Sequence, residues 1–187
     1  MTVSFKTSRR RLLGLFSGVA LVGASPRVLS ATFSGTSLKR ELAMSHTHTH
    51  ERLALIYAVD KRYIPDALMN LDHFLRDHYS GDVGSMDPAL YDIMHRMRHA
   101  LKVKTPYHII SAYRSPKTNE HLRTTRAGGV AKRSLHMDGK AIDLRIPGVP
   151  LKEIRDVALE LGAGGVGYYP KDQFVHIDTG SVRSWRG

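Results

Sequence analysis

Two histidines and one aspartate in the second half of the chain are the residue types of a metal centre. His136 and Asp143 lie seven residues apart, and His176 follows 33 residues after Asp143. Two imidazoles and one carboxylate form the protein ligand set of a catalytic zinc, whose fourth position stays open for water. Both ligand types are available at neutral pH without an unusual pKa. Because the chain has 11 histidines, the spacing alone also allows three unrelated surface residues.

The segments around these residues indicate the elements that would hold them. Alternation over Ala141–Ile146 predicts a strand that enters the core and carries Asp143. Gly139, just before this strand, suits a chain that must turn back on itself. A further strand is predicted over Tyr107–Tyr113. It ends directly before Arg114, at a point where rigid backbone can aim a side chain.

Apolar residues at helical spacing predict helices between and after these strands. One helix has a clear start, since Asp87 is a good N-cap and Pro88 suits the first helical position. The predicted order is a strand or hairpin, two helices, a strand, a helix, a strand, a helix and short strands. This order predicts an α+β fold, with a small, mostly antiparallel sheet and helices packed on one side. The predicted helices cover residues 64–79, 88–102, 116–127 and 150–161.

The N-terminal part of the chain has the layout of an export signal. Three arginines precede the short apolar run Leu12–Val22, and small residues follow it. We therefore expect residues 1–31 to be a twin-arginine-type signal peptide. Residues 32–44 are rich in Ser, Thr and Gly and predict a linker, which leaves residues 45–187 as the functional domain. The alternative for the leader is a basic arm of a DNA-binding protein.

His46, His48 and His50 alternate with threonines near the start of this domain. On a strand they would share one face and could form a second metal site. The favoured alternative is an edge strand that opens a hairpin with Leu53–Val59.

The composition indicates one globular domain without cysteine chemistry. The chain has 187 residues, 42% of them hydrophobic, and no cysteine, which excludes disulfides and thiolate metal sites. Its formal charge is +11, and residues 32–187 keep 23 basic against 17 acidic residues. This excess favours an anionic partner, either nucleic acid or a bacterial cell wall rich in carboxylates and phosphates. The leader and the lack of an aromatic-basic pattern argue against nucleic acid.

Ser134–Asp143 read Ser-x-His-x-x-Gly-x-Ala-x-Asp, which resembles the signature of zinc peptidases acting on bacterial cell walls. That clan includes D-alanyl-D-alanine peptidases, lysostaphin-like enzymes and the Hedgehog fold. Ser111–Ser115, Gly164–Pro170 and Phe174–Asp178 resemble more narrowly the murein endopeptidase K group, a short exported branch.

This resemblance implies a Hedgehog-like zinc peptidase fold with Zn²⁺ held by His136, Asp143 and His176. It also implies that Arg114 binds the scissile carbonyl or a substrate carboxylate, which its planar fork suits. The implied function is hydrolysis of amide bonds in peptidoglycan stem peptides and cross-links. We expect a periplasmic monomer with no stable membrane span and no nucleic-acid partner. The alternatives are a D-alanyl-D-alanine carboxypeptidase and a non-catalytic zinc-bearing wall-binding module.

The chain departs from the clan at the general base. Relatives place an acidic residue three positions before the last ligand, or a histidine two positions before it. Here these positions are Gln173 and Phe174. Asp178, two residues after His176, would lie on the same strand face and is predicted to be the base or an orienting residue. Asp172 is the next candidate.

Overall fold

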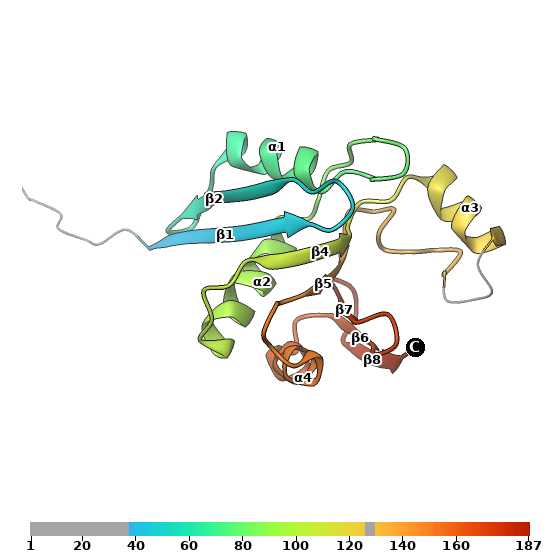
Figure 1. Cartoon of the computed structure of the whole chain (residues 1–187). Coiled ribbons are helices and arrows are strands. Elements are labelled where there is room, and N and C mark those ends of the chain that lie inside the picture. Colours follow the sequence, from blue (N-terminus) through green and yellow to red (C-terminus); the bar gives the residue numbers. More distant parts are fainter. Residues whose placement is uncertain (1–37, 126–129) are drawn as a thin grey trace, which may run out of the picture. The chain divides into compact units, whose positions relative to one another are not determined.

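The computed structural model describes residues 38–125 and 130–187, which belong to one compact unit spanning Thr36–Gly187. The predicted signal peptide lies outside the described residues. Within them the fold is α+β, with four helices and one eight-stranded sheet in the order β3-β2-β1-β4-β5-β7-β6-β8 (Figure 1). The helices are α1 (Pro65–Phe74), α2 (Pro88–Leu101), α3 (Pro116–Thr125) and α4 (Leu151–Leu161). The strands are β1 (Lys39–His46), β2 (Arg52–Val59), β3 (Arg62–Tyr63), β4 (Tyr107–Ser111), β5 (Ala141–Arg145), β6 (Gly165–Tyr169), β7 (Phe174–Asp178) and β8 (Arg183–Arg186).

The sheet is mixed, so the prediction of a mostly antiparallel sheet was wrong. β1 pairs parallel to β4, and β6 pairs parallel to β8, while the other neighbours pair antiparallel. The first parallel pair follows from chain connectivity. Two helices lie between β1 and β4, which is the long crossover that parallel neighbours require. The second arises because the chain leaves β7 and returns on the far side of β6.

The first strand begins earlier than the predicted domain boundary. β1 starts at Lys39, inside the predicted linker, and buries alternate side chains at Leu42, Met44 and His46. It pairs with β2, so the hairpin exists, but β1 is an interior strand, with β4 on its other side. His48 lies beyond the strand, in the turn.

Three helices and one face of the sheet share a single hydrophobic core. α1, α2 and α4 each contribute buried residues to it, among them Leu71, Met94 and Ile154. On β7 the core side chains are Val175 and Ile177. α3 contributes none of the buried residues of this core and extends away from the sheet in Figure 1.

α2 starts after its predicted cap, Asp87, and the same residue links two loops. The Asp87 side chain accepts from Ala89 N at 3.0 Å, with Pro88 at the first helical position. The Asp87 amide donates to Gly139 O at 2.8 Å, and its second carboxylate oxygen accepts from Thr179 Oγ1 at 2.7 Å. One residue thereby links the turn after His136 to the loop after β7. No helix among the described residues is long and apolar enough to cross a membrane.

Candidate metal centre

His136, Asp143 and His176 converge on one buried point on the sheet face opposite the core. One donor atom from each lies within 4.8 Å of the others, and they are the only such group of three in residues 38–125 and 130–187. Their exposed fractions are 4%, 7% and 9%. Asp143 and His176 are direct partners in the β5–β7 ladder, so their side chains share this face. The hydrophobic side chains next to them, such as Ile142 and Ile177, point into the core.

His136 comes from a tight turn just before β5. Its Nδ1 donates to Ala112 O at 2.7 Å, which leaves Nε2 as the nitrogen with a lone pair. This Nε2 lies 3.4 Å from Asp143 Oδ1. The His136 carbonyl in turn accepts from Arg114 N at 3.1 Å, so the segment that follows β4 fixes both the ring and the backbone of the residue.

Gly139 closes the turn that carries His136. Its φ of +65° lies in the left-handed region, which favours glycine. A Cβ at this position would lie 2.0 Å from Ser85 O. The sequence therefore needs glycine here for both conformation and space.

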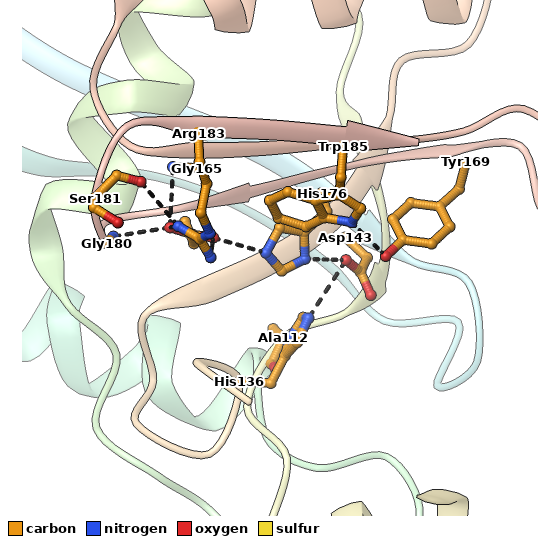
Figure 2. A network of polar contacts seen from close by, with 11 residues as sticks. Ala112, His136, Asp143, Gly165, Tyr169, His176, Gly180, Ser181, Arg183 and Trp185 are labelled. Atoms are coloured by element: carbon orange, nitrogen blue, oxygen red, sulfur yellow. Dashed lines mark hydrogen bonds and ion pairs between the residues drawn. The ribbon is translucent and has the colours of Figure 1, made fainter. Parts of the chain in front are cut away.

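His176 presents the opposite nitrogen, as Figure 2 shows. Its Nδ1 lies 2.8 Å from Asp143 Oδ1, and its Nε2 donates to Asp178 Oδ2 at 3.1 Å. In both histidines one ring nitrogen therefore faces the Asp143 carboxylate while the other is bonded to a protein oxygen. This is the arrangement by which protein partners fix the tautomer and orientation of metal-binding imidazoles.

Burial disfavours the charged form of all three residues, and the opposite charges and hydrogen bonds of their neighbours act against this effect. Burial lowers the pKa of His136, although the charge of Asp143 acts against this shift. Burial alone would raise the pKa of Asp143, but the two imidazoles hold it well below its usual range. Burial would likewise lower the pKa of His176, but hydrogen bonds to Asp143 and Asp178 raise it to about 9. Asp143 favours a proton on His176 Nδ1, and a divalent cation can take the place of that proton.

Asp178 is enclosed by donors. The residue is 1% exposed, and its carboxylate accepts from Gly165 N at 3.0 Å and Gly180 N at 2.8 Å. Arg183 donates to both of its oxygens, at 3.0 and 2.7 Å. Burial would raise the pKa of Asp178, but the bonds from His176, Arg183 and the two amides keep it well below its usual range. The surroundings of this carboxylate therefore keep it ionised, and it holds His176 through a hydrogen bond.

Arg114 lies beside the site and is held by neighbouring polar groups. Its guanidinium donates to Asn119 Oδ1 and Ser111 Oγ, both at 3.4 Å. Ser111 itself pairs with Asp143, because the β4–β5 register shifts between Ile109 and Ser111. The charge of Arg114 contributes to the lowered pKa of His136, after the larger effect of burial.

Asp172, and the two positions at which relatives carry the base, lie in the turn between β6 and β7 or at the start of β7. Asp172 and Gln173 are exposed in the turn between β6 and β7, where Gln173 has a φ of +60° and donates to Pro170 O. Phe174 stacks on Tyr169, with ring centroids 4.5 Å apart. His48 stacks on His78 with centroids 4.1 Å apart, but the histidines near β1 do not form a second group with metal-binding geometry in the described part of the chain.

Sequence reasoning missed Arg183 and Trp185. Trp185 lies with its ring centroid 5.1 Å from that of His176, and its Nε1 donates to Tyr169 Oη at 2.8 Å. Both residues belong to β8, a short strand at the C-terminus. The sequence signal for this strand is the alternation of Arg183, Trp185 and Gly187 after the turn. This alternation is too short to identify a strand by itself.

Comparisons with known proteins give a consistent result. The family model for the peptidoglycan L,D-endopeptidase MepK matches residues 34–185. The peptidoglycan L,D-endopeptidase MepK of Escherichia coli is 44% identical over 182 residues, 97% of this chain and 98% of that protein. The probable peptidoglycan L,D-endopeptidase MepK of Haemophilus influenzae is 39% identical over 182 residues, 96% of each chain. No solved structure matches. The chain, with its buried His-Asp-His centre, thus belongs to the MepK family of M15-type peptidases.

Proposed function

We propose that this protein is a zinc-dependent peptidoglycan endopeptidase that hydrolyses amide bonds in the peptide cross-links of the cell wall. Membership of the MepK family supports the reaction and the substrate class. The observation that carries the metal part is the buried group of His136, Asp143 and His176, in which the outward nitrogen of each imidazole is already bonded.

The donor set fits Zn²⁺. Two imidazole nitrogens and one carboxylate oxygen are three protein ligands, which leaves a coordination position open for water or substrate. His136 would bind through Nε2, Asp143 through Oδ1 and His176 through Nδ1. When bound, zinc lowers the pKa of a water ligand and polarises a carbonyl oxygen.

The chain itself supplies charge and orientation around this position. Arg114 lies just after β4, next to the strand that carries Asp143, and can donate to a substrate carbonyl or carboxylate oxygen through its fork. Donors aimed at a developing oxyanion contribute ~10²–10³ in rate. Asp178 keeps His176 in the tautomer that leaves Nδ1 free for the metal. Of the two roles expected for Asp178, general base or orienting residue, we therefore propose the orienting one.

Export accompanies this function, since peptidoglycan lies outside the cytoplasm. The basic and apolar N-terminal residues support a twin-arginine-type signal and a periplasmic location. We also propose that the domain acts as a monomer.

The test combines metal content with product analysis. The purified protein should bind about one zinc per chain and cut cross-linked muropeptide dimers into monomers. Monomeric pentapeptide should stay intact, because the proposed activity is internal cleavage of cross-links. Release of terminal D-alanine without dimer cleavage would instead identify a carboxypeptidase.

Alanine variants of the three ligands provide the residue-level test. His136→Ala, Asp143→Ala and His176→Ala should each lower bound zinc and abolish dimer cleavage. His99→Ala, at an exposed position on α2, is the matched control and should retain both. Full zinc occupancy in the three ligand variants would contradict the assignment.

A further inference from the structure

The C-terminal strand β8 forms a second layer of contacts behind the metal centre. β8 pairs with β6, which pairs with β7, so Trp185, Gly167 and His176 form one row across three strands. Arg183 pairs with Gly165 in the next row on the same face, and Asp178 accepts from the Gly165 amide in that row.

At Gly165 and Gly167, β6 has no side chain on this face. A Cβ on Gly165 would lie 2.4 Å from both Arg183 Nη1 and Asp178 Oδ2. A Cβ on Gly167 would lie 2.6 Å from the Trp185 ring. The glycine-rich segment therefore leaves room for two β8 side chains to lie across β6 and reach β7.

Arg183 connects β8 to the carboxylate that holds His176. Its two terminal nitrogens donate to the two oxygens of Asp178, at 3.0 and 2.7 Å, and Nη1 also donates to Ser181 O (Figure 2). The guanidinium carbon lies 5.0 Å from the Trp185 ring centroid, a cation–π distance. A bidentate pair fixes the orientation of a carboxylate as well as its charge.

Trp185 packs against the imidazole itself. Its ring lies 5.1 Å from that of His176, centroid to centroid, and Nε1 donates to Tyr169 Oη, which anchors the far edge of the indole (Figure 2). Asp178 therefore restricts rotation of the His176 ring through one nitrogen, while Trp185 packs against the ring.

We propose that Arg183 and Trp185 are positioning residues, which hold Asp178 and His176 so that His176 Nδ1 points into the metal centre. Neither residue needs to touch the substrate or the metal for this role. The inference rests on the proposed function, because the positioning role matters only if His176 binds a metal. The hydrogen bond between His176 and Asp178 can nevertheless be measured independently of activity.

The first test uses Arg183→Gln and two readouts. Zinc affinity, measured by competition with a chelator, should fall by about 10–100-fold, the usual effect of losing a partner behind a ligand. The His176 Nε2 proton, which should exchange slowly in wild type and be visible in ¹H–¹⁵N spectra, should be lost or exchange much faster. Arg183→Lys should give an intermediate affinity, because Lys keeps the charge but not the fork.

Arg186→Gln is the matched control. Arg186 lies on the same strand, is exposed and stacks on Tyr168, 5.8 Å from the ring centroid. This variant should keep the affinity and the proton signal of wild type. Wild-type affinity together with a wild-type signal in Arg183→Gln would overturn the proposal.

Gly167→Ala provides a second route that leaves the β8 side chains intact. The added Cβ must displace the indole, so His176 Nε2 exchange should accelerate and zinc affinity should fall, as in Trp185→Ala. Trp185→Phe keeps an aromatic ring against His176 and should lie closer to wild type. Unchanged exchange and affinity in Gly167→Ala and Trp185→Ala would remove Trp185 from the proposal.

The outcomes separate this inference from the proposed function. If His176→Ala retains its zinc, the metal assignment fails whatever the β8 variants do. If His176→Ala loses zinc but Arg183→Gln keeps both the wild-type zinc affinity and the wild-type proton signal, the metal centre stands and only the positioning role fails.

Discussion

The two candidate histidine ligands present different ring nitrogens, and in each case the other nitrogen explains why. His136 donates Nδ1–H to the Ala112 carbonyl, so Nε2 faces Asp143. His176 donates Nε2–H to Asp178, so Nδ1 faces the same carboxylate. The partner behind each ring therefore decides which nitrogen is available to a metal.

Asp178→Asn distinguishes an orienting residue from a general base. Asn keeps the shape but removes the charge and places an NH₂ group among five donor contacts. We expect zinc affinity to fall by about 10–100-fold, with kcat largely restored when zinc saturates the variant.

Zinc titration followed by turnover measurements checks this expectation. Asp172→Asn, at an exposed turn position, is the control and should match wild type. If Asp178→Asn binds zinc normally but loses ~10²–10⁴ in kcat, Asp178 is the base instead.

Arg114→Lys tests the forked donor beside the centre. Lys retains the charge but offers no planar pair of N–H groups for an oxyanion. Zinc content and melting temperature should stay near wild type, while kcat/KM falls by about 10²-fold or more. Near wild-type kcat/KM would show that Arg114 acts only through contacts within the protein, such as those with Ser111 and Asn119.

His46 should make stability depend on pH. Its side chain is 2% exposed, and burial, with a contribution from His48, lowers its pKa from 6.5 to about 4. Above pH 6.5 both folded and unfolded forms are neutral at this residue. As pH falls from 6.5 toward 4, the unfolded chain gains a proton that the folded protein disfavours, so stability is lost by up to about 3 kcal/mol.

Urea unfolding at pH 7 and pH 4.5 measures this loss. His46→Asn keeps an acceptor for the amides of His48 and Thr49 but cannot titrate, so its stability should fall less between the two pH values than that of wild type. His50→Asn, at an exposed turn position, should lose as much as wild type. Equal losses in all three proteins would contradict the prediction.

At the level of elements, the turn before β5 depends most sharply on a single residue. Gly139→Ala combines a positive φ with a Cβ that would meet Ser85 O at 2.0 Å. Gly148→Ala is a matched control, since Gly148 has a φ of +80° but a Cβ added there would meet no atom within 4 Å.

Both substitutions should cost about 1 kcal/mol or more through backbone strain. Gly139→Ala should cost clearly more, because the added Cβ meets backbone at Ser85 O. It should also weaken zinc binding, because a shift of the turn away from Ser85 moves His136. Chemical denaturation with zinc titration checks both effects. Equal costs and unchanged zinc affinity would show that the turn relaxes freely.

Short-range sequence signals predicted correctly those elements whose local preferences agree with their tertiary contacts. The Asp87 cap, the β5 alternation and the helix before Gly162 all have short-range causes, and the structure has them within a few residues. The helix expected over residues 64–79 is shorter, because it ends at Phe74 and the chain continues in a loop whose Asp77 accepts from Ser115 N. A partner 38 residues away is not visible in a local pattern.

The parts of the site that sequence reasoning missed depend on strand order. β8 adds to β6 rather than to its chain neighbour β7, and only this order brings Arg183 to Asp178 and Trp185 to His176. The start of β1 was predicted too late because Lys39–Met44 follows a Ser- and Thr-containing region, whereas its burial against the core decides its structure.

At the scale of the whole domain, the sheet lies between the hydrophobic core, which stabilises the fold, and the candidate metal centre. The hydrophobic core lies on the face covered by α1, α2 and α4, while Asp143 and His176 lie on the opposite face of β5 and β7. Among the described residues, none of the three candidate ligands has a buried side-chain nitrogen or oxygen without a hydrogen-bond partner. We therefore expect the core to form without a metal.

Metal removal should abolish activity without unfolding the domain. After treatment with a chelator, we expect an unchanged far-UV circular dichroism spectrum, a cooperative unfolding transition and no cleavage of muropeptide dimers. Added zinc should stabilise the fold by mass action, by about 1.4 kcal/mol for each tenfold rise in free zinc above its dissociation constant. His176→Ala should keep the fold but show no such dependence, because it lacks one of three ligands. Loss of secondary structure in the metal-free protein would instead mean that the metal holds β5 and β7 together, and the core on the other face would be insufficient for folding.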